Sequence, residues 1–475
     1  MEIDKDLAAR QEARTLCRQA QKAQVQLRTM SQSQLDAITE SIAQAFQRHA
    51  TELAELAVRE TGFGNVADKT VKNTFASKTV LDAIRDMKTV GILNRHPDQK
   101  LWEVGVPVGV IAAIVPSTNP TSTICYKALI ALKAGNAIVF SPHPKALECS
   151  LRAAKIVEQA ATAAGAPAGS IGCLSLASMA GCQELMAAPE VSMILATGGP
   201  AMVRAAYSSG KPAIGVGAGN GPAYIHHSAD IGQALDCILR SKSFDNGTVC
   251  ASEQSIIVEK AMEEPVRQEG QRRGFYFMNQ DEAGHLAKLL FRPNGSLNPD
   301  IVGKEAAALA RMAGFSVPCS TKILVAREQE AGPTRPYSME KLCPVLAFFV
   351  MPDEKSVLEK SIEVLTHEGS GHTFAMHCND EAVIRKFAAK VPVSRFLVNT
   401  PAALGGIGSS TGLFPALTLG CGAVGGSSSS NNISPLDLIN IRRVAWGSEQ
   451  PKFEKQSFDP ALVDLLTQKI LEKLG

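Results

Sequence analysis

The stretch that decides the fold begins with VGVIAAIVP, Val108–Pro116, a short and almost wholly apolar run. A longer segment with helical character, TSTICYKALIALKAG, follows it and leads into a second apolar run, NAIVF, at 136–140. KALECSLRAAKIVEQAATAAG and then MILAT, at 193–197, repeat the alternation. Apolar strands separated by helices are typical of a parallel sheet covered on both faces. We therefore predict an α/β fold, in which the carboxyl ends of the strands are the expected place for a nucleotide.

A second series of strands and helices begins near Ala229 and contains the candidate strands SIIVEK, TKILVA and RFLVNT. The chain has 475 residues, whereas one domain usually has roughly 100–200. We therefore predict a second α/β domain. Residues 31–60 precede both series and have helical spacing, with one apolar face formed by Leu35, Ile38, Ile42 and Phe46.

The C-terminal part combines a polar loop, a strand-like run and a separate helix. The loop GSSSSNN, at 426–432, is followed by LINIRRVAW and then by the charged segment GSEQPKFEKQSFDP. The last residues, DPALVDLLTQKILEKLG, predict an amphipathic helix whose apolar stripe contains Val463, Leu466, Ile470 and Leu474. Because a linker precedes this helix, we expect it to lie outside the main core.

The composition argues against several classes of protein. The formal net charge is only +2, so the chain lacks the basic excess that neutralises nucleic-acid phosphates. No apolar run reaches the ~18 residues of a membrane span, and the polar start MEIDKDLAARQEARTLCRQAQ is unlike a signal peptide. The 11 cysteines are scattered, which favours reduced thiols in the cytoplasm over disulfides or a zinc site.

Three glycine-rich motifs suggest ligand sites, and two of them fail on context. Gly420, Gly422 and Gly425 have the spacing G-x-G-x-x-G, but serines and asparagines follow instead of a helix, so we interpret them as a structural turn. HEGSGH, at 367–372, interrupts its two histidines with glycines, so they cannot share a helix face and we predict no metal site. GVGAGNG, at 215–221, fits a close backbone approach to a ligand and an ordinary turn equally well.

Cys250 is the candidate nucleophile. It stands in FDNGTVCASEQ, where Asn246 and Gly247 predict a bend directly before a strand. A nucleophilic cysteine needs exposure, nearby N–H donors and a lowered pKa, and such a loop can supply the first two. The alternative is a small core residue, and position alone leaves both readings open.

Four segments together resemble one family: VPVGVIAAIVPSTNPTST, NAIVFSPHPKA, LATGGPAMVRAAYSSGKPAIGVGAGNGP and FDNGTVCASEQS. They are similar to the bacterial CoA-acylating aldehyde dehydrogenases. That group includes the aldehyde half of the bifunctional alcohol/aldehyde dehydrogenase and the propionaldehyde dehydrogenases of bacterial microcompartments. The resemblance extends over residues 10–446 and implies a Rossmann-like cofactor domain, a catalytic α/β domain and an oligomerisation flap built from two separated segments.

On this basis we expect four parts in the chain. Residues 1–226 would form the cofactor-binding domain, with a flap strand near 98–107. A catalytic domain at 227–424 would be followed by a return segment and oligomerisation strand at 425–447. Residues 448–475 would form a linker and an amphipathic helix that resembles an encapsulation peptide.

Carried over residue by residue, the resemblance implies that Cys250 attacks the aldehyde and that the Asn119 amide and the Cys250 N–H stabilise the oxyanion. It also implies cofactor contacts: Thr197, Gly198 and Gly199 near the pyrophosphate, Ser141 and Pro142 near the adenosine ribose, and Glu340 at the nicotinamide ribose. NAD is the expected cofactor. NADP stays open, because SPHPK has no acidic residue to repel a 2′-phosphate. His372 resembles a position typical of the acylating group, where it either helps to deprotonate the CoA thiol or anchors a loop.

Val216 marks a departure from the hydrolytic members of the wider superfamily. Those enzymes have an E-L-G-G-K segment whose glutamate activates water. When GVGAGNGP is aligned with that segment, Val216 falls at the position of the glutamate. Valine cannot accept a proton, so hydrolysis of a thioester loses its general base, and transfer of the acyl group to the thiol of CoA is favoured.

The expected reaction is therefore aldehyde plus NAD⁺ plus CoA to acyl-CoA plus NADH, with NADH leaving before CoA attacks. Acetaldehyde or propionaldehyde is the expected substrate, and sulfoacetaldehyde stays open. A hydrolytic dehydrogenase that yields the free acid and a non-catalytic scaffold are the alternatives. We expect a homodimer or homotetramer without a metal, nucleic acid or membrane, in the cytoplasm or in a bacterial microcompartment. Residues 457–475 would contact a shell or other cargo, or else form a helix packed on the domain.

Overall fold

Two separate parallel sheets carry the two series of strands. The computed structural model describes residues 4–447 and 459–474. The first sheet has five parallel strands in the order β5-β4-β3-β6-β7. Their bounds are β3 (Val110–Ile114), β4 (Ala137–Ser141), β5 (Ile171–Cys173), β6 (Val191–Thr197) and β7 (Ala213–Val216). The strands predicted from the three apolar runs are β3, β4 and β6, which confirms the α/β fold class.

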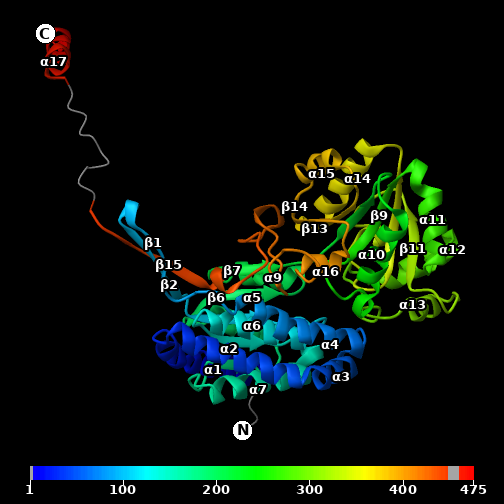
Figure 1. Ribbon diagram of the computed structural model, residues 1–475, viewed down its shortest axis with the longest axis horizontal. Helices are drawn as coiled ribbons and strands as arrows, with labels where there is room; N and C mark the ends of the chain where they lie inside the picture. The colour runs from blue at the N-terminus through cyan, green and yellow to red at the C-terminus, as the bar shows by residue number, and fades with distance from the viewer. Residues whose placement is uncertain (1–3, 448–458, 475) are drawn as a thin grey trace.

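Helices cover both faces of this sheet, as its apolar strands require. All five residues of β3 and of β4 are buried, and every residue of α6 (Pro120–Lys133) is buried as well. In Figure 1 the colours of this lobe run from blue through cyan to the green of β6 and β7. Its other helices are α1 (Lys5–Leu27), α2 (Gln32–Arg48), α3 (Ala50–Thr61), α4 (Val66–Thr74), α5 (Val80–Ile84), α7 (Leu147–Ala163), α8 (Met179–Ala187) and α9 (Pro200–Tyr207). The helical segment expected at 31–60 is thus divided between α2 and α3, because His49 leaves the helical conformation with φ −102° and ψ 9°.

The second sheet lies in the lobe on the right of Figure 1, whose colours run from green through yellow to orange. Its order is β10-β11-β12-β9-β8-β13-β14, and every pair in it is parallel. The strands are β8 (Gly221–Ile225), β9 (Glu253–Glu259), β10 (Phe275–Phe277), β11 (Ile323–Glu328), β12 (Val345–Met351), β13 (Gly371–His377) and β14 (Val393–Val398). The predicted strands SIIVEK, TKILVA and RFLVNT are β9, β11 and β14. The helices are α10 (Ile231–Ser243), α11 (Glu263–Arg272), α12 (Gln280–Leu290), α13 (Ala306–Met312), α14 (Glu354–His367), α15 (Glu381–Ala388) and α16 (Ala402–Gly406).

Successive residues of the second sheet enter cores on opposite faces. Ile257 of β9 belongs to one buried cluster, whereas Ile256 and Val258 belong to the other. This alternation follows from the two-residue repeat of a strand. It explains why these strands are apolar almost throughout.

A third, antiparallel sheet extends from the body as the ribbon on the left of Figure 1. It joins β1 (Gly91–His96) and β2 (Leu101–Pro107) to β15 (Ile439–Ala445), which pairs with the full length of β2. Trp102 and Trp446 meet edge to face, with ring centroids 4.9 Å apart. The two segments predicted for a flap, near 98–107 and within 425–447, therefore pair with each other, while the proposed domain limits stay a prediction.

Short turns complete the described chain. A π-helical turn joins α4 to α5 at Phe75–Thr79, and 3₁₀ turns lie at Pro97–Gln99, Pro144–Ala146, Phe244–Gly247, Lys260–Met262, Pro336–Ser338, Ala423–Gly425 and Pro435–Leu438. The predicted C-terminal helix is α17 (Pro460–Leu474), and all of its residues are exposed. The linker predicted before it lies mostly at 448–458, outside the described residues.

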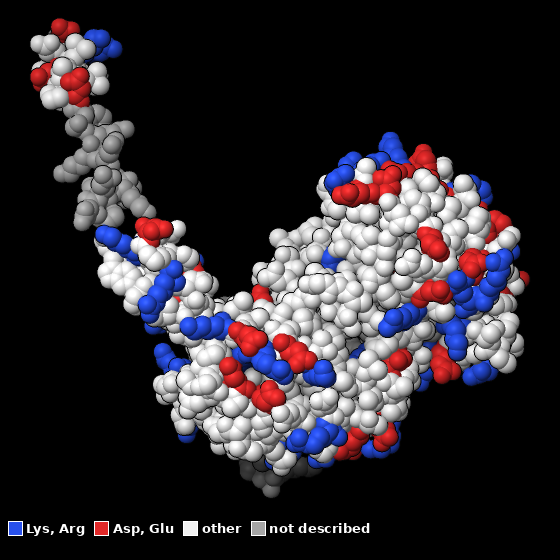
Figure 2. Space-filling model, viewed as in Figure 1, with Lys and Arg blue, Asp and Glu red and all other residues white. Residues whose placement is uncertain are grey.

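The surface carries a mixture of charges. On the face in Figure 2, basic and acidic side chains are intermingled. The hollow between the antiparallel sheet of β1, β2 and β15 and the second lobe is largely uncharged. Within residues 4–447 and 459–474, no helix combines the length and the apolar character that a membrane crossing requires.

Candidate active site

One pocket collects residues from both lobes at the carboxyl ends of the first sheet. Strand β3 leads into residues 117–119, β6 into 197–199 and β7 into 216–218, and all three segments line the pocket. The second lobe contributes the segment before β9, at 248–250. The carboxyl ends of parallel strands are where open α/β sheets bind their ligands.

Most of the predicted site residues lie on the wall of this pocket. They are Asn119, Thr197, Gly198, Gly199, Val216, Cys250 and Glu340. Ser141 and Pro142 line a second pocket, which shares Thr197, Gly198 and Gly199 with the first. The two pockets therefore form one continuous lining from Ser141 to Cys250.

The bend before Cys250 is present and begins one residue earlier than predicted. Asp245, Asn246 and Gly247 have φ values of 48°, 52° and 76°, all in the left-handed region. A side chain at Gly247 would place its Cβ 2.9 Å from the backbone of Cys343, so this position requires glycine. Hydrogen bonds hold the other two residues: Asp245 Oδ1 accepts from the Asn65 N–H at 2.9 Å, and Asn246 Nδ2 donates to Gly303 O at 2.9 Å.

The thiol of Cys250 differs from the exposed, low-pKa cysteine that the loop suggests. As a residue, Cys250 is half-buried. Its sulfur is nevertheless desolvated, and this raises the pKa of the thiol to about 12. The nearby Glu340 and Cys421 raise this pKa further, and the cation of Arg395 opposes them. Arg395 is itself buried on β14 and donates to the carbonyl of Gly420 at 2.7 Å. At neutral pH the thiol is therefore protonated in the free protein.

Asn119 has a cationic partner that the sequence pattern does not reveal. It is the N-cap residue of α6 and is followed by Pro120 at the first helical position. Its Oδ1 accepts a hydrogen bond of 2.6 Å from Lys72 Nζ, and its Nδ2 donates to Thr118 Oγ1 at 3.1 Å. Lys72 also lines the pocket and pairs with the buried carboxylate of Asp245. Lys69 and Lys72 are spaced three apart in one helix, but nothing in the sequence connects either lysine with Asp245.

Glu340 holds the glycine-rich segment 215–221 in place. Its Oε1 accepts a 2.8 Å hydrogen bond from the Gly219 N–H, and its own N–H donates to Glu368 Oε2 at 2.7 Å. Burial, reinforced by Glu368, raises the pKa of Glu340 to about 8. A Cβ at Gly219 would lie 2.0 Å from Cys250 O. GVGAGNG is therefore a segment that must approach the Cys250 backbone closely.

His372 does not line either of these pockets. It is fully buried on β13, behind Gly219, where a Cβ at that glycine would lie 3.2 Å from His372 Cε1. Its Nδ1 is 2.9 Å from Thr373 Oγ1, and its Nε2 has no hydrogen-bond partner in the part of the chain that the structure describes. Burial lowers the pKa of His372 to about 3, so the imidazole is neutral at neutral pH.

The shared wall of the two pockets fits a dinucleotide. Thr197 Oγ1 is buried and has no partner among the described residues, and it lies next to Gly198 and Gly199. A Cβ at Gly199 would meet no atom within 4 Å, and this residue caps the N-terminus of α9. Backbone N–H groups at a helix N-terminus, together with a free hydroxyl, suit a pyrophosphate. Within the described chain, no acidic residue lines the pocket around Ser141.

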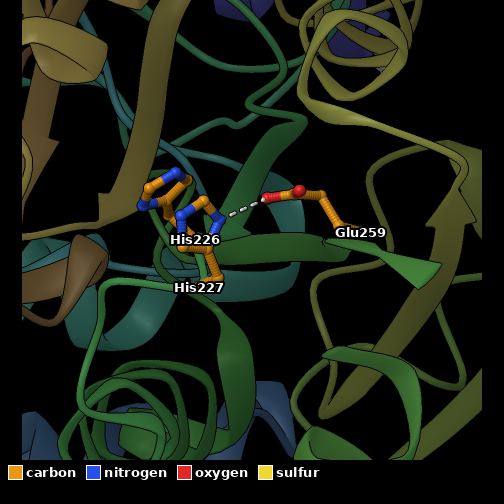
Figure 3. A group of neighbouring side chains, drawn as sticks. All are labelled: His226, His227 and Glu259. Carbon is orange, nitrogen blue, oxygen red and sulfur yellow. Dashed lines mark hydrogen bonds and ion pairs between the residues drawn. The ribbon is translucent and has the colours of Figure 1, made fainter. Parts of the chain in front are cut away.

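His226, His227 and Glu259 form a separate group of side chains of the kinds that bind metals (Figure 3). The three side chains lie near the ends of β8 and β9, with ligand atoms within 4.8 Å of one another. The imidazole rings of His226 and His227 are tilted by 40° to one another, with centroids 3.8 Å apart. Nδ1 of His226 already accepts from the Ser228 N–H. His227 pairs with Glu259 at 3.2 Å, and this contact accounts for the cluster without an ion.

The two motifs rejected on context have structural roles. Residues 423–425 form a 3₁₀ turn rather than a helix, and a Cβ at Gly420 would lie 2.3 Å from Ser429 O. His367 ends α14, whereas His372 lies in β13. The glycines therefore serve backbone packing, and the two histidines share no helix face.

A parallel sheet of the nucleotide-binding type thus faces a second α/β lobe, and a cysteine and an asparagine line the pocket between them. Residues 4–273 match the aldehyde dehydrogenase family. The chain belongs to this family. The predicted family and fold are thereby confirmed.

Solved structures and curated relatives also support membership of the aldehyde dehydrogenase family. The acetylating aldehyde dehydrogenase of Geobacillus thermoglucosidasius superposes with a TM-score of 0.93 at 48% identity, covering 95% of this chain and all of that one (100%). Succinate-semialdehyde dehydrogenase (acetylating) of Clostridium kluyveri is 34% identical, over 92% of this chain and 96% of its own length. The bifunctional aldehyde-alcohol dehydrogenase AdhE of Escherichia coli is 43% identical over 94% of this chain, which spans only 50% of that protein. The chain thus spans about half the length of the bifunctional relatives.

Proposed function

We propose that this chain is a CoA-acylating aldehyde dehydrogenase, which oxidises a short-chain aldehyde with a nicotinamide cofactor and releases the acyl group as its CoA thioester. The observation that carries the proposal is the wall around Cys250. Val216 lines it, at the position that the sequence alignment gives to the general base of hydrolytic members, and Glu340 is the single carboxylate among the described lining residues. Because Glu340 already accepts from Gly219, it is poorly placed to activate a water. The names of the acetylating relatives agree with this conclusion.

Cys250 and Asn119 carry the chemistry in this proposal. The Cys250 thiol gives up its proton to water, its sulfur then bonds to the carbonyl carbon as the C=O π bond breaks, and the resulting oxyanion is stabilised by Asn119 Nδ2 and the Cys250 N–H. When bound, the nicotinamide supplies the acceptor for the hydride that leaves the substrate carbon. Cys250 then holds the acyl group as a thioester until the thiol of CoA displaces it. Because Val216 cannot accept a proton, no general base at that position activates water to hydrolyse the thioester during that interval.

Thr197, Gly198 and Gly199 would hold the pyrophosphate of the cofactor, Ser141 and Pro142 would contact the adenosine ribose, and Glu340 the nicotinamide ribose. NAD is the proposed cofactor. The absence of an acidic residue among the described lining residues near Ser141 supports acceptance of NADP as well. His372 has two proposed roles, as the base for the CoA thiol or as the anchor of a loop. Its unpartnered Nε2 supports the role of base, whereas its burial supports that of a loop anchor.

The proposed substrate is a small neutral aldehyde such as acetaldehyde or propionaldehyde. Lys72 is the one lysine or arginine among the described residues that line the pocket, and Asp245 and Asn119 already occupy its ammonium group. An anionic aldehyde would therefore find no available cation. Sulfoacetaldehyde, the substrate in the name of a Bilophila wadsworthia relative that is 34% identical, serves as the contrasting test substrate.

The decisive experiment measures NADH formation with and without CoA and identifies the product by mass spectrometry. We expect NADH formation to depend on CoA and acyl-CoA to accumulate. Cys250→Ala should abolish turnover, whereas Cys319→Ala, which removes an exposed thiol, should retain it. Full-rate NADH formation without CoA, with free acid as the product, would instead establish the hydrolytic reaction, and full activity of Cys250→Ala would refute the role of the cysteine.

The antiparallel sheet of β1, β2 and β15, together with helix α17, forms the proposed assembly surface. Ile441, Val444 and Trp446 are exposed on or beside β15, which supports a homodimer or homotetramer formed through this sheet. The exposed apolar residues of α17 support docking to a microcompartment shell or to other cargo. One solved relative, 27% identical, is a propionaldehyde dehydrogenase from the fucose utilisation microcompartment of Clostridium phytofermentans. The proposed location is therefore the cytoplasm, inside such a compartment.

A further inference from the structure

A buried network of charges lies directly behind Asn119. Lys69 and Lys72 of α4 both contact Asp245 Oδ2, at 2.8 Å and 2.5 Å, and the three side chains are 3%, 4% and 0% exposed. Lys72 Nζ also donates to Thr248 Oγ1 at 2.9 Å. Asp68 joins the network by accepting from the Asp245 N–H at 2.7 Å. The half-buried Asp68 and the buried Asp245 thus balance the two buried lysines in charge.

The contact between Lys72 and Asn119 fixes the direction of the Asn119 amide. An ammonium group has donors but no acceptor, so only the amide oxygen can face it at 2.6 Å. If the amide were reversed, its NH₂ group would lie against the cation and a buried hydrogen bond would be lost. The NH₂ group is therefore turned away from Lys72. One hydrogen of this NH₂ group is donated to Thr118 Oγ1 at 3.1 Å, and the other is the donor that remains for an oxyanion in the pocket.

The same network reaches the cysteine through Asp245. Asp245 is the first residue of the left-handed bend, and Thr248, two residues before Cys250, donates to its Oδ2 at 2.7 Å. The ammonium group of Lys72 therefore bridges Asn119 in the first lobe to the Asp245–Thr248 turn in the second. It touches both sides of the pocket at once.

We propose that Lys72 is a positioning residue, which orients the Asn119 amide toward the oxyanion and, through Asp245, fixes the distance between Asn119 and the Cys250 loop. This inference rests on the proposed function, because it presumes that Asn119 stabilises an oxyanion formed at Cys250. Lys72 stays hydrogen-bonded to protein groups throughout and transfers no proton. Lys69 contacts the same carboxylate but donates to Thr118 O rather than to the Asn119 side chain, so it serves as the matched control.

The test is a double-mutant cycle of Lys72→Met and Asn119→Ala, with Lys69→Met as the control. Lys72→Met should lower kcat by roughly 10- to 100-fold with little change in KM, since loss of one oxyanion donor costs roughly 100- to 1000-fold. In the Asn119→Ala background, Lys72→Met should lower kcat by less than about threefold, because the amide that it orients is gone. Lys69→Met should lower the thermal midpoint as much as Lys72→Met does, but kcat by much less.

Three outcomes would overturn the inference: multiplicative losses in the double variant, an equal loss of kcat in Lys69→Met, or normal kcat in Lys72→Met. If Lys72→Met does not fold, the variant Lys72→Met/Asp245→Asn removes a positive and a negative charge together. This variant then replaces Lys72→Met in the cycle with Asn119→Ala. Cys250→Ala separates this inference from the proposed function. Activity in Cys250→Ala would defeat the proposed function, whereas an inactive Cys250→Ala beside normal kcat in Lys72→Met would defeat only the role of Lys72.

Discussion

Val216 ends β7 with its side chain buried in the wall of the Cys250 pocket. Replacement of Val216 by glutamate should give CoA-independent formation of NADH and of free acid, because a carboxylate there can take a proton from water that attacks the thioester. The ratio of free acid to acyl-CoA, measured at fixed CoA by mass spectrometry, should rise by about tenfold or more, since general-base catalysis contributes roughly 100-fold or more.

Val216→Gln is the matched control for this substitution. Glutamine has nearly the size of glutamate but accepts no proton at neutral pH, so it should lower activity through crowding without changing the ratio of products. If the glutamate variant releases only acyl-CoA, the missing base does not explain why the thioester on Cys250 reacts with the thiol of CoA rather than with water.

At the level of single residues, sequence reasoning found the groups that share a pocket but not their surroundings. The resemblance to one family singles out Cys250, Asn119 and the turn at 197–199, and all of them line one pocket. Lys72 was missed, because its partner Asp245 is 173 positions away and a pair of lysines on a helix is usually solvated. The rise in the Cys250 pKa was missed for a similar reason, since desolvation depends on the packing of both lobes.

Among the elements, those with strong local patterns were predicted and those defined by distant pairing were not. β3, β4 and β6 follow from apolar runs, and α6 is bounded by Pro120 at its start. β8, with the sequence GPAYI, has no such pattern, yet it is buried throughout between β9 and β13. The order of seven strands in the second sheet likewise depends on tertiary packing.

The C-terminal helix α17 is the element whose role is most directly testable. Its apolar residues include Leu466, Ile470 and Leu474, which are 51%, 56% and 80% exposed. Because α17 buries none of its residues, deletion of residues 457–475 should leave kcat and the thermal midpoint unchanged, the latter to within about 1 °C, while association with shell protein is lost. Co-sedimentation with purified shell protein measures that association.

Point variants of α17 separate a specific contact from a general effect of truncation. Leu466→Asp and Ile470→Asp disrupt the apolar stripe and should prevent co-sedimentation, whereas Gln468→Asp, on the opposite face, should not. A lower thermal midpoint after the deletion would show instead that the helix packs on the body of the protein.

The molecule as a whole brings its two lobes together around buried ionisable groups, and this has a consequence for its stability in acid. His377 ends β13, is 1% exposed, and has a pKa lowered by burial from 6.5 to about 4. Below pH 6.5 the unfolded chain binds a proton at this histidine that the folded chain does not. The contribution of His377 to the free energy of unfolding therefore falls as the pH drops from about 6.5 toward 4, whereas the raised pKa of the buried Glu340 carboxyl acts in the opposite direction. His372, whose pKa is lowered to about 3, acts in the same direction as His377.

His377→Gln tests this consequence, because glutamine does not titrate. Between pH 7 and pH 5 the wild-type chain should lose about 2 kcal/mol of unfolding free energy through His377 alone, and the variant should lose correspondingly less. Urea unfolding at the two pH values measures the difference, and this range avoids the titration of most surface carboxylates. His285→Gln, at an exposed histidine, should keep the wild-type pH dependence. An unchanged pH dependence in His377→Gln would mean that His377 can be protonated within the folded protein.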